Sequence, residues 1–130
     1  MDNELFELCK EVYEKTEWGK PTDEELTDVE FYYAQDGEIY HIASWNHEPF
    51  SVPLYTSDYL LEKLPKTSPR SKDAYLAVMK KNTPKDVRST IVYSAGFFTG
   101  YGWSYNYKAD TPLKALLKLV IALNDAGVNL

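Results

Sequence analysis

The chain has 130 residues, of which 44% are hydrophobic and 26% are charged, and these globular values exclude a disordered chain. A single cysteine excludes an internal disulfide framework and a zinc site built from several cysteines. No apolar run reaches the roughly 18–20 residues of a membrane span, and the acidic start Met1–Glu4 is unlike a signal peptide. We therefore expect one cytoplasmic, soluble domain over residues 1–130.

Two features of the composition are unusual. Aromatic residues make up 15% of the chain, and 11 of them are tyrosines. Residues 1–48 contain 14 acidic side chains against three lysines, a net charge of −11, whereas residues 49–130 contain 6 acidic and 11 basic side chains, a net charge of +5. This separation predicts a surface with two poles of opposite sign, unless both sets are simply solvated faces.

The first predicted element is a helix over residues 3–15, ended by the glycine and proline of Gly19-Lys20-Pro21. Its apolar stripe is predicted from helical spacing to consist of Leu5, Leu8, Cys9 and Val12. Phe6 and Tyr13 lie at the edges of this stripe. Because Cys9 has glutamate and leucine neighbours, we expect a buried structural thiol rather than a nucleophile.

A β-hairpin is the clearest local signal in the sequence. Asp36-Gly37 separates two runs of strand composition, 29–34 and 38–43, and glycine supplies the positive φ that a tight hairpin turn needs. The following segment, 45–55, contains two prolines and is predicted to be irregular and extended.

The second half of the chain begins with a short predicted helix over 59–64, with candidate N-cap residues at 56–58 and Pro65 after its end. Residues 74–79 fit either a strand or a helix, and we favour a strand. A second antiparallel pair follows over 89–107, with a bend expected near its glycines.

The last predicted element is a helix over 111–125, with Thr111 or Asp110 as its cap, Pro112 in its first turn and Gly127 after its end. Its inward residues are predicted to be Leu113, Leu116, Val120 and Leu123. The element order α-ββ-α-ββ(β)-α predicts an α+β fold, a sandwich in which helices flank an antiparallel β-sheet.

No motif in the sequence specifies catalysis. His41, His47 and Glu48 could supply metal ligands, but their spacing matches no zinc signature. The glycines of 96–102 lead into aromatic strand sequence, whereas a phosphate-binding loop would lead into a helix. We therefore expect a protein that is not an enzyme and that uses no cofactor and no metal.

The candidate recognition surface lies in the aromatic cluster over 93–107, where seven of fifteen residues are aromatic. Strand alternation places Tyr101, Trp103, Tyr105 and Tyr107 on one face, which is either core or a row of anchors. We expect at least two of the four to be partly exposed. Further site residues are predicted nearby or in the basic 63–88 stretch, namely Trp45, His47, Arg70 and Arg88.

Aromatic side chains beside basic ones suit nucleotides and single-stranded nucleic acid. A net charge of −6 works against long polyanions, so a small phosphorylated ligand fits better than duplex DNA. The alternative is that the basic stretch is a solvated face and the aromatic residues are core.

Two segments resemble a known family. Val52-Pro53-Leu54-Tyr55-Thr56-Ser57-Asp58 is similar to a "P-x-Y-S/T-x-D" segment, and Ala109-Asp110-Thr111-Pro112-Leu113-Lys114-Ala115-Leu116 to an "A-D-T-P-x-x-A-L" helix start. Both patterns are those of the phage ABA-sandwich domain family, a group of small phage and prophage proteins of unknown function. The resemblance covers about residues 50–127, and its motifs are helix caps and core leucines. This chain departs from the family in its aromatic hairpin and its basic 63–88 stretch.

The resemblance implies a phage or prophage protein acting in the cytoplasm of a bacterial host. We expect a non-enzymatic inhibitor that binds a protein component of a bacterial defence system, with an acidic half that could imitate nucleic acid. One alternative is a sponge that sequesters a small nucleotide immune signal, and another is a virion or assembly accessory protein. No membrane partner is expected, and a homo-oligomer stays open.

Overall fold

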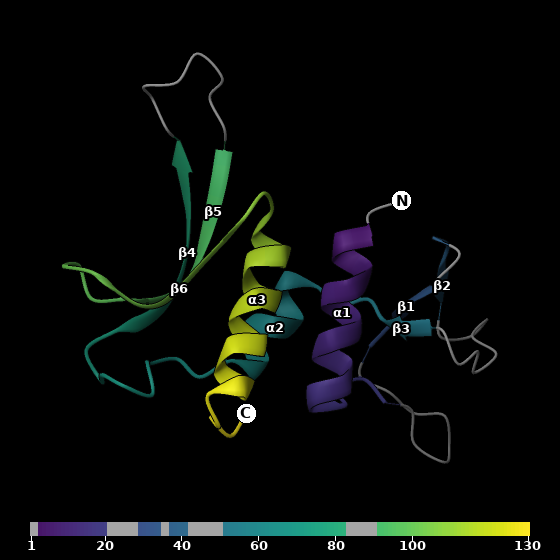
Figure 1. Ribbon diagram of the computed structural model, residues 1–130, viewed down its shortest axis with the longest axis horizontal. Coiled ribbons are helices and arrows are strands. Elements are labelled where there is room, and N and C mark those ends of the chain that lie inside the picture. Colours follow the sequence, from purple (N-terminus) through teal and green to yellow (C-terminus); the bar gives the residue numbers. More distant parts are fainter. Residues whose placement is uncertain (1–2, 21–28, 35–36, 42–50, 83–90) are drawn as a thin grey trace. The chain divides into compact units, whose positions relative to one another are not determined.

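The computed structural model describes residues 3–20, 29–34, 37–41, 51–82 and 91–130 (Figure 1). Over these residues it contains three helices and two three-stranded antiparallel sheets, which confirms the predicted α+β class. The chain divides into two compact units, Met1–Thr56 and Ser57–Leu130. The predicted single-domain organisation stays a prediction. Among the described helices, none combines the length and the apolar character needed to cross a membrane.

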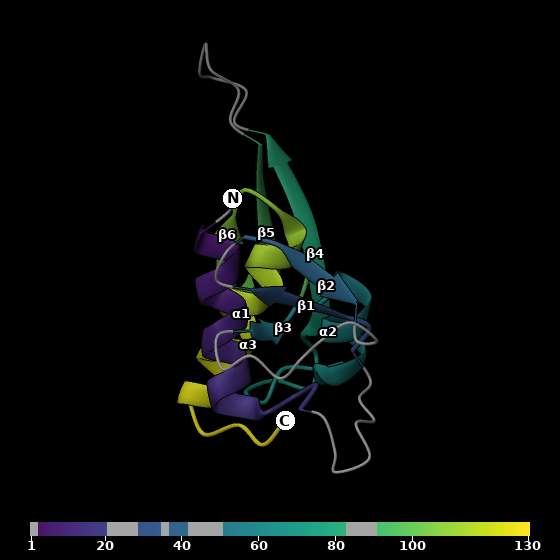
Figure 2. The same cartoon turned by 90° about the vertical axis from the view of Figure 1, so that its right-hand side faces the viewer.

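The first unit contains one helix and one sheet. The helix α1 spans Asn3–Thr16, and the strands β1 (Phe31–Ala34), β2 (Ile39–His41) and β3 (Ser51–Pro53) pair in the order β2-β1-β3. The pairing of β1 with β2 confirms the hairpin, and Gly37 has the expected positive φ of 91°. Helix α1 packs against β3 (Figure 2).

The strand β3 corrects the prediction that 45–55 is irregular throughout. Val52 pairs with Tyr33, and Pro53 with Tyr32, at the edge of the sheet. Proline lacks an N–H donor, so it is tolerated at an edge strand but not in a central one. Residues 45–50 of the predicted segment lie outside the described residues.

The apolar face of α1 differs from the prediction. Its buried residues are Phe6, Cys9 and Val12, whereas Leu8 is only half-buried. The ring of Phe6 lies 5.5 Å from that of Tyr33, so the phenylalanine belongs to the core rather than to the edge of the stripe. A stripe centred on residues 6, 9 and 12 has helical spacing too, and its large ring fills more of the space beside the sheet.

Within the first unit, buried tyrosines tie β1 and the residues after β3 to the segment that follows α1. The hydroxyl of Tyr32 donates a hydrogen bond of 2.8 Å to the carbonyl of Gly19, and the hydroxyl of Tyr55 donates one of 2.7 Å to the carbonyl of Trp18. Both rings are almost completely buried. Each hydroxyl therefore satisfies a polar atom that burial would otherwise penalise.

The second unit contains the helices α2 (Ser57–Lys63) and α3 (Pro112–Asp125) and the strands β4 (Tyr75–Asn82), β5 (Ile91–Phe98) and β6 (Trp103–Ala109). The strands pair in the order β4-β5-β6, and α3 packs against β5, β6 and α2 (Figure 1). The strand favoured for 74–79, the second antiparallel pair and the last helix are thereby confirmed. Leu116, Val120 and Leu123 are fully buried as predicted, while Leu113 is half-buried.

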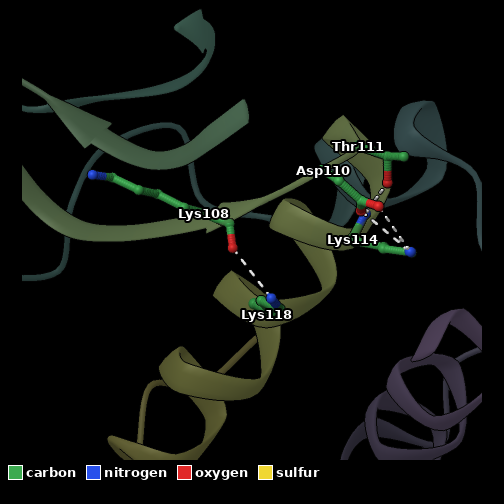
Figure 3. Close-up of polar contacts among 5 residues, drawn as sticks. All are labelled: Lys108, Asp110, Thr111, Lys114 and Lys118. Atoms are coloured by element: carbon green, nitrogen blue, oxygen red, sulfur yellow. Dashed lines mark hydrogen bonds and ion pairs between the residues drawn. The ribbon is translucent and has the colours of Figure 1, made fainter. Parts of the chain in front are cut away.

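Polar contacts fix the start of α3 to the end of β6 (Figure 3). The side chain of Thr111 accepts a hydrogen bond of 3.2 Å from the backbone N–H of Lys114, which confirms it as the cap. The buried ammonium of Lys114 lies 3.2 Å from the carboxylate of Asp110. One turn later, Lys118 Nζ donates to the carbonyl of Lys108. These contacts hold α3 in one position along the sheet.

Candidate functional site on the second sheet

A β-bulge in β6 decides which aromatic side chains share a face. Tyr107 pairs with Ala95, but Ser104 pairs with Phe97, so Tyr105 and Asn106 together oppose Gly96. Tyr105 has a φ of 58°, in the left-handed region that a tyrosine rarely adopts. The extra residue shifts the alternation by one position. Two residues an even number of positions apart, such as Trp103 and Tyr107, therefore point to opposite faces when the bulge lies between them.

The bulge overturns the prediction that Tyr101, Trp103, Tyr105 and Tyr107 lie on one face. Trp103 pairs with Phe98, whereas Tyr107 shares the opposite face with Ala95. Tyr101 precedes β6 in the turn and is fully exposed. The expectation that at least two of the four are partly exposed is confirmed, because the other three are half-buried.

One face of the second sheet is covered and the other is open. Ala95 and Phe97 are fully buried and lie on one face of β5, which marks the side against which α3 packs. On the other face, Tyr75 is 62% exposed and Met79 is 37% exposed. We refer to this second face as the open face.

Three aromatic side chains cross the open face in one line. Tyr75 of β4 pairs with Phe98 of β5, which pairs in turn with Trp103 of β6. Residues that pair directly across neighbouring strands have side chains on the same face. The rings of Phe98 and Trp103 lie 5.0 Å apart with a tilt of 47°, and both are half-buried. We call Tyr75, Phe98 and Trp103 the aromatic row.

Small side chains and a lysine lie beside the aromatic row on the open face. The next register position pairs Ala77 with Gly96, and a Cβ built on Gly96 would lie 3.1 Å from the Trp103 ring. The indole thus packs close to the backbone of β5. One position further, Ser94 lies between Met79 of β4 and the exposed Lys108 of β6.

The bulge also brings two predicted site residues together on the covered side. The guanidinium carbon of Arg70 lies 4.2 Å from the centre of the Tyr105 ring, a cation–π contact. The same ring meets Phe97 edge-on at 6.4 Å. Beside it, the hydroxyls of Ser68 and Ser104 are 2.8 Å apart, which ties the loop before β4 to β6. Of the remaining predicted site residues, Trp45, His47 and Arg88 lie outside the described residues.

Sequence reasoning missed Tyr75 as a site residue. Tyr75, Ala77 and Met79 alternate along β4 and are its open-face residues, but the segment fitted a helix as well as a strand. Phe98 belongs to the predicted aromatic cluster, but the sequence does not indicate which residues lie beside it in the sheet. Only the register of β4 with β5 and β6 places these residues in one line with Trp103.

Cys9 is buried, as predicted. Burial raises the pKa of its thiol from 9.0 to about 11, an effect that a backbone hydrogen bond with Tyr55 partly opposes. The thiol therefore stays protonated at neutral pH, and a nucleophile or metal ligand would need the thiolate.

The predicted metal ligands are only partly described. His41 Nε2 lies 3.5 Å from a carboxylate oxygen of Glu30, while His47 and Glu48 lie outside the described residues. Within the part of the chain that the structure describes, no three His, Cys, Asp or Glu side chains are placed to hold a metal ion. The prediction for these three residues stays untested.

No family model, no curated protein and no solved structure matches the chain. The phage ABA-sandwich family therefore remains a resemblance carried by the two segments quoted above.

Proposed function

We propose that this protein is a non-enzymatic binding protein whose recognition surface is the open face of β4-β5-β6. The observation that carries the proposal is the aromatic row, in which Tyr75, Phe98 and Trp103 are aligned across three strands. Tyrosine and tryptophan are the side chains that most often dominate binding energy, because each contributes a large rigid surface and a polar atom.

The row is also fixed before any partner arrives. Backbone pairing sets the register of the three strands, and Gly96 lets the Trp103 indole pack against the sheet. A surface that is ordered in advance loses less conformational entropy on binding than a flexible loop does. Recognition of this kind requires only occupation of a surface, with no chemical step.

The target that we propose is a component of a bacterial defence system. This step rests on the resemblance to phage and prophage proteins, for which blocking a host component is a role that a small binding surface can perform. A protein component is the first candidate, in keeping with the prominence of tyrosine and tryptophan in the row.

A second candidate is sequestration of a small nucleotide signal. It is favoured by the charge of the second unit, in which residues 57–130 contain 11 basic against 6 acidic side chains. A nucleotide combines a base that stacks on aromatic rings with phosphates that lysines attract.

The proposal is tested by expressing the protein in bacterial strains that each carry one defence system and by counting phage plaques. In at least one strain we expect the protein to restore plaque formation, and the double variant Tyr75→Ala/Trp103→Ala to lose this effect. Leu61→Ala is the matched control, because Leu61 is an exposed apolar residue of the same unit that lies on α2. A row variant that folds and protects phage as well as the unchanged protein does would refute the assignment of the surface.

A further inference from the structure

We infer that the open face of the second sheet binds single-stranded nucleic acid, with its bases stacked on the aromatic row. The inference rests on the proposed function, since it takes this face to be the recognition surface, and it favours a nucleic-acid strand over a protein component as the ligand of that face. It concerns the exposed Tyr75 together with Phe98 and Trp103, which the register places side by side.

The dimensions of the row suit a single strand. Neighbouring strands of a sheet lie about 4.8 Å apart, so a row across β4, β5 and β6 extends over roughly 10 Å. A nucleic-acid strand that crosses the sheet can place successive unstacked bases on such rings, because every base has a π-face. In a duplex the bases are stacked on one another, and their faces cannot reach a flat protein surface.

The backbone beside the row supports the Trp103 ring. The next position contains Ala77 and Gly96, which have the smallest side chains on this face. A larger residue at position 96 would displace the Trp103 indole, to which a Cβ there would come within 3.1 Å. The indole therefore lies over the buried backbone of Gly96, which holds its ring in place for stacking.

Charge favours an anionic ligand over a cationic or neutral one. The strands Tyr75–Asn82, Ile91–Phe98 and Trp103–Ala109 contain no Asp or Glu, although the whole chain has 20 acidic residues, and they contain three lysines. Lys108 is exposed on the open face, two residues from the bulge. The second unit has a net charge of +5, so phosphates are attracted to the unit that carries the row.

The test uses the full chain and a fluorescent oligothymidylate about 12 nucleotides long, with binding followed by anisotropy and by quenching of tryptophan fluorescence. We expect saturable binding at about 50 mM salt that weakens as the salt is raised to about 200 mM. Trp103→Ala should raise the Kd at least about tenfold, Trp103→Phe should restore part of the affinity, and Leu61→Ala should leave it unchanged. Unlabelled single strand should compete, whereas a duplex of the same length should not.

Since Trp103 is half-buried, Tyr75→Ala provides a second variant at a mostly exposed position, and thermal melting by circular dichroism verifies the fold of both. The inference is overturned if the strand does not bind, if folded Tyr75→Ala and Trp103→Ala bind it as the unchanged protein does, or if a cyclic dinucleotide binds the row more tightly than the strand. Phage protection that still depends on the row after such a result preserves the proposed function. Protection that is independent of the row refutes the proposed function itself, whatever the oligonucleotide does.

Discussion

The two compact units of this chain differ in charge and in the way their cores are closed. Residues 1–56 have a net charge of −11 and bury two tyrosines, Tyr32 and Tyr55, whose hydroxyls reach the backbone after α1. Residues 57–130 have a net charge of +5 and bury the leucines of α3 against a sheet whose other face is open. The formal charge of −6 for the whole chain therefore conceals two opposite regions.

This difference indicates which unit suits which partner. The charge changes sign between residues 48 and 63, and the boundary between the units, after Thr56, lies within that interval. An anionic ligand is repelled by the first unit and attracted by the second, where the aromatic row lies. Net charge for the whole chain is thus a poor guide to its ligands, and the charge of each unit is a better one.

The largest expected effect is on the second unit alone, through Gly96→Ala. A Cβ at this position would overlap the carbonyl oxygen of Tyr105, which is backbone held by the bulge and cannot rotate away. We expect the free energy of unfolding to fall by about 3 kcal/mol or more, at the upper end of what overpacking costs. Hydrogen exchange followed by mass spectrometry should show loss of protection in β5 and β6.

Gly102→Ala is the matched control for this variant. Gly102 has no heavy atom within 4 Å of an added Cβ and no positive φ, so we expect a change of less than about 0.5 kcal/mol. If exchange in α1 and β1 also rises in Gly96→Ala, the two units unfold together and their comparison as separate bodies fails. Protection that is lost only in residues 57–130 supports two independent units.

Much of the secondary structure could be predicted from local patterns. The Asp36-Gly37 turn predicted the first hairpin, and Thr111-Pro112 together with the leucine spacing predicted α3. These signals depend on residues that are close in the sequence. The choice of Phe6 over Leu8 for the buried face of α1 depends on the ring of Tyr33, far along the chain, and could not be found from periodicity alone.

The candidate site shows the same limit more strongly. Alternation along β6 predicted four rings on one face, but the left-handed Tyr105 reverses the alternation after Trp103. A glycine in a strand often marks a bulge, but a tyrosine at the bulged position gives no comparable signal in the sequence. The nearest hint is Gly96 on the facing strand, whose missing side chain admits the Tyr105 carbonyl. The strand register places Tyr75 beside Phe98 and Phe98 beside Trp103. Tyr75 and Trp103 are 28 residues apart, so local sequence patterns do not reveal this arrangement.

The second-largest expected effect is on the stability of the first unit, which should depend on pH through Cys9. The folded thiol of Cys9 has a pKa of about 11, against 9.0 for an accessible thiol, so the unfolded chain loses its proton first as the pH rises. The resulting stabilisation is complete below pH 9 and is lost between about pH 9 and 11, by about 2–3 kcal/mol. Urea denaturation at pH 7.5 and 10.5 measures the loss.

Cys9→Ala isolates this contribution, because every other side chain is common to the two proteins. The smaller side chain lowers the free energy of unfolding by the same amount at both pH values. Between pH 7.5 and 10.5, however, the stability of the variant should fall less than that of the unchanged protein. Equal falls in both proteins would contradict the buried state of the thiol.

A smaller effect is expected from Tyr32→Phe in the same unit. The substitution keeps the ring in the core and removes the hydroxyl that donates to the Gly19 carbonyl at 2.8 Å. Losing one buried hydrogen bond should reduce the free energy of unfolding by about 1–2 kcal/mol, measured by urea denaturation. Tyr13→Phe, at a half-buried ring of α1, serves as the control for removing a tyrosine hydroxyl. An equal cost at both positions would mean that the Tyr32 bond does not stabilise the first unit.

The smallest effect on stability is expected at Tyr101, and it sharpens the boundary of the site. Tyr101 is fully exposed in the turn before β6, where its neighbours Gly100 and Gly102 place few atoms around it. Tyr101→Ala should therefore change the melting temperature hardly at all, since surface substitutions usually stay within about 0.5 kcal/mol.

The effect of Tyr101→Ala on binding is the informative measurement. Because Tyr101 lies two residues before Trp103 but outside the paired strands, a ligand confined to the open face should bind Tyr101→Ala as it binds the unchanged protein. A loss of affinity as large as that of Trp103→Ala, with stability unchanged, would extend the recognition surface from the aromatic row to the turn and would restore Tyr101 to the site.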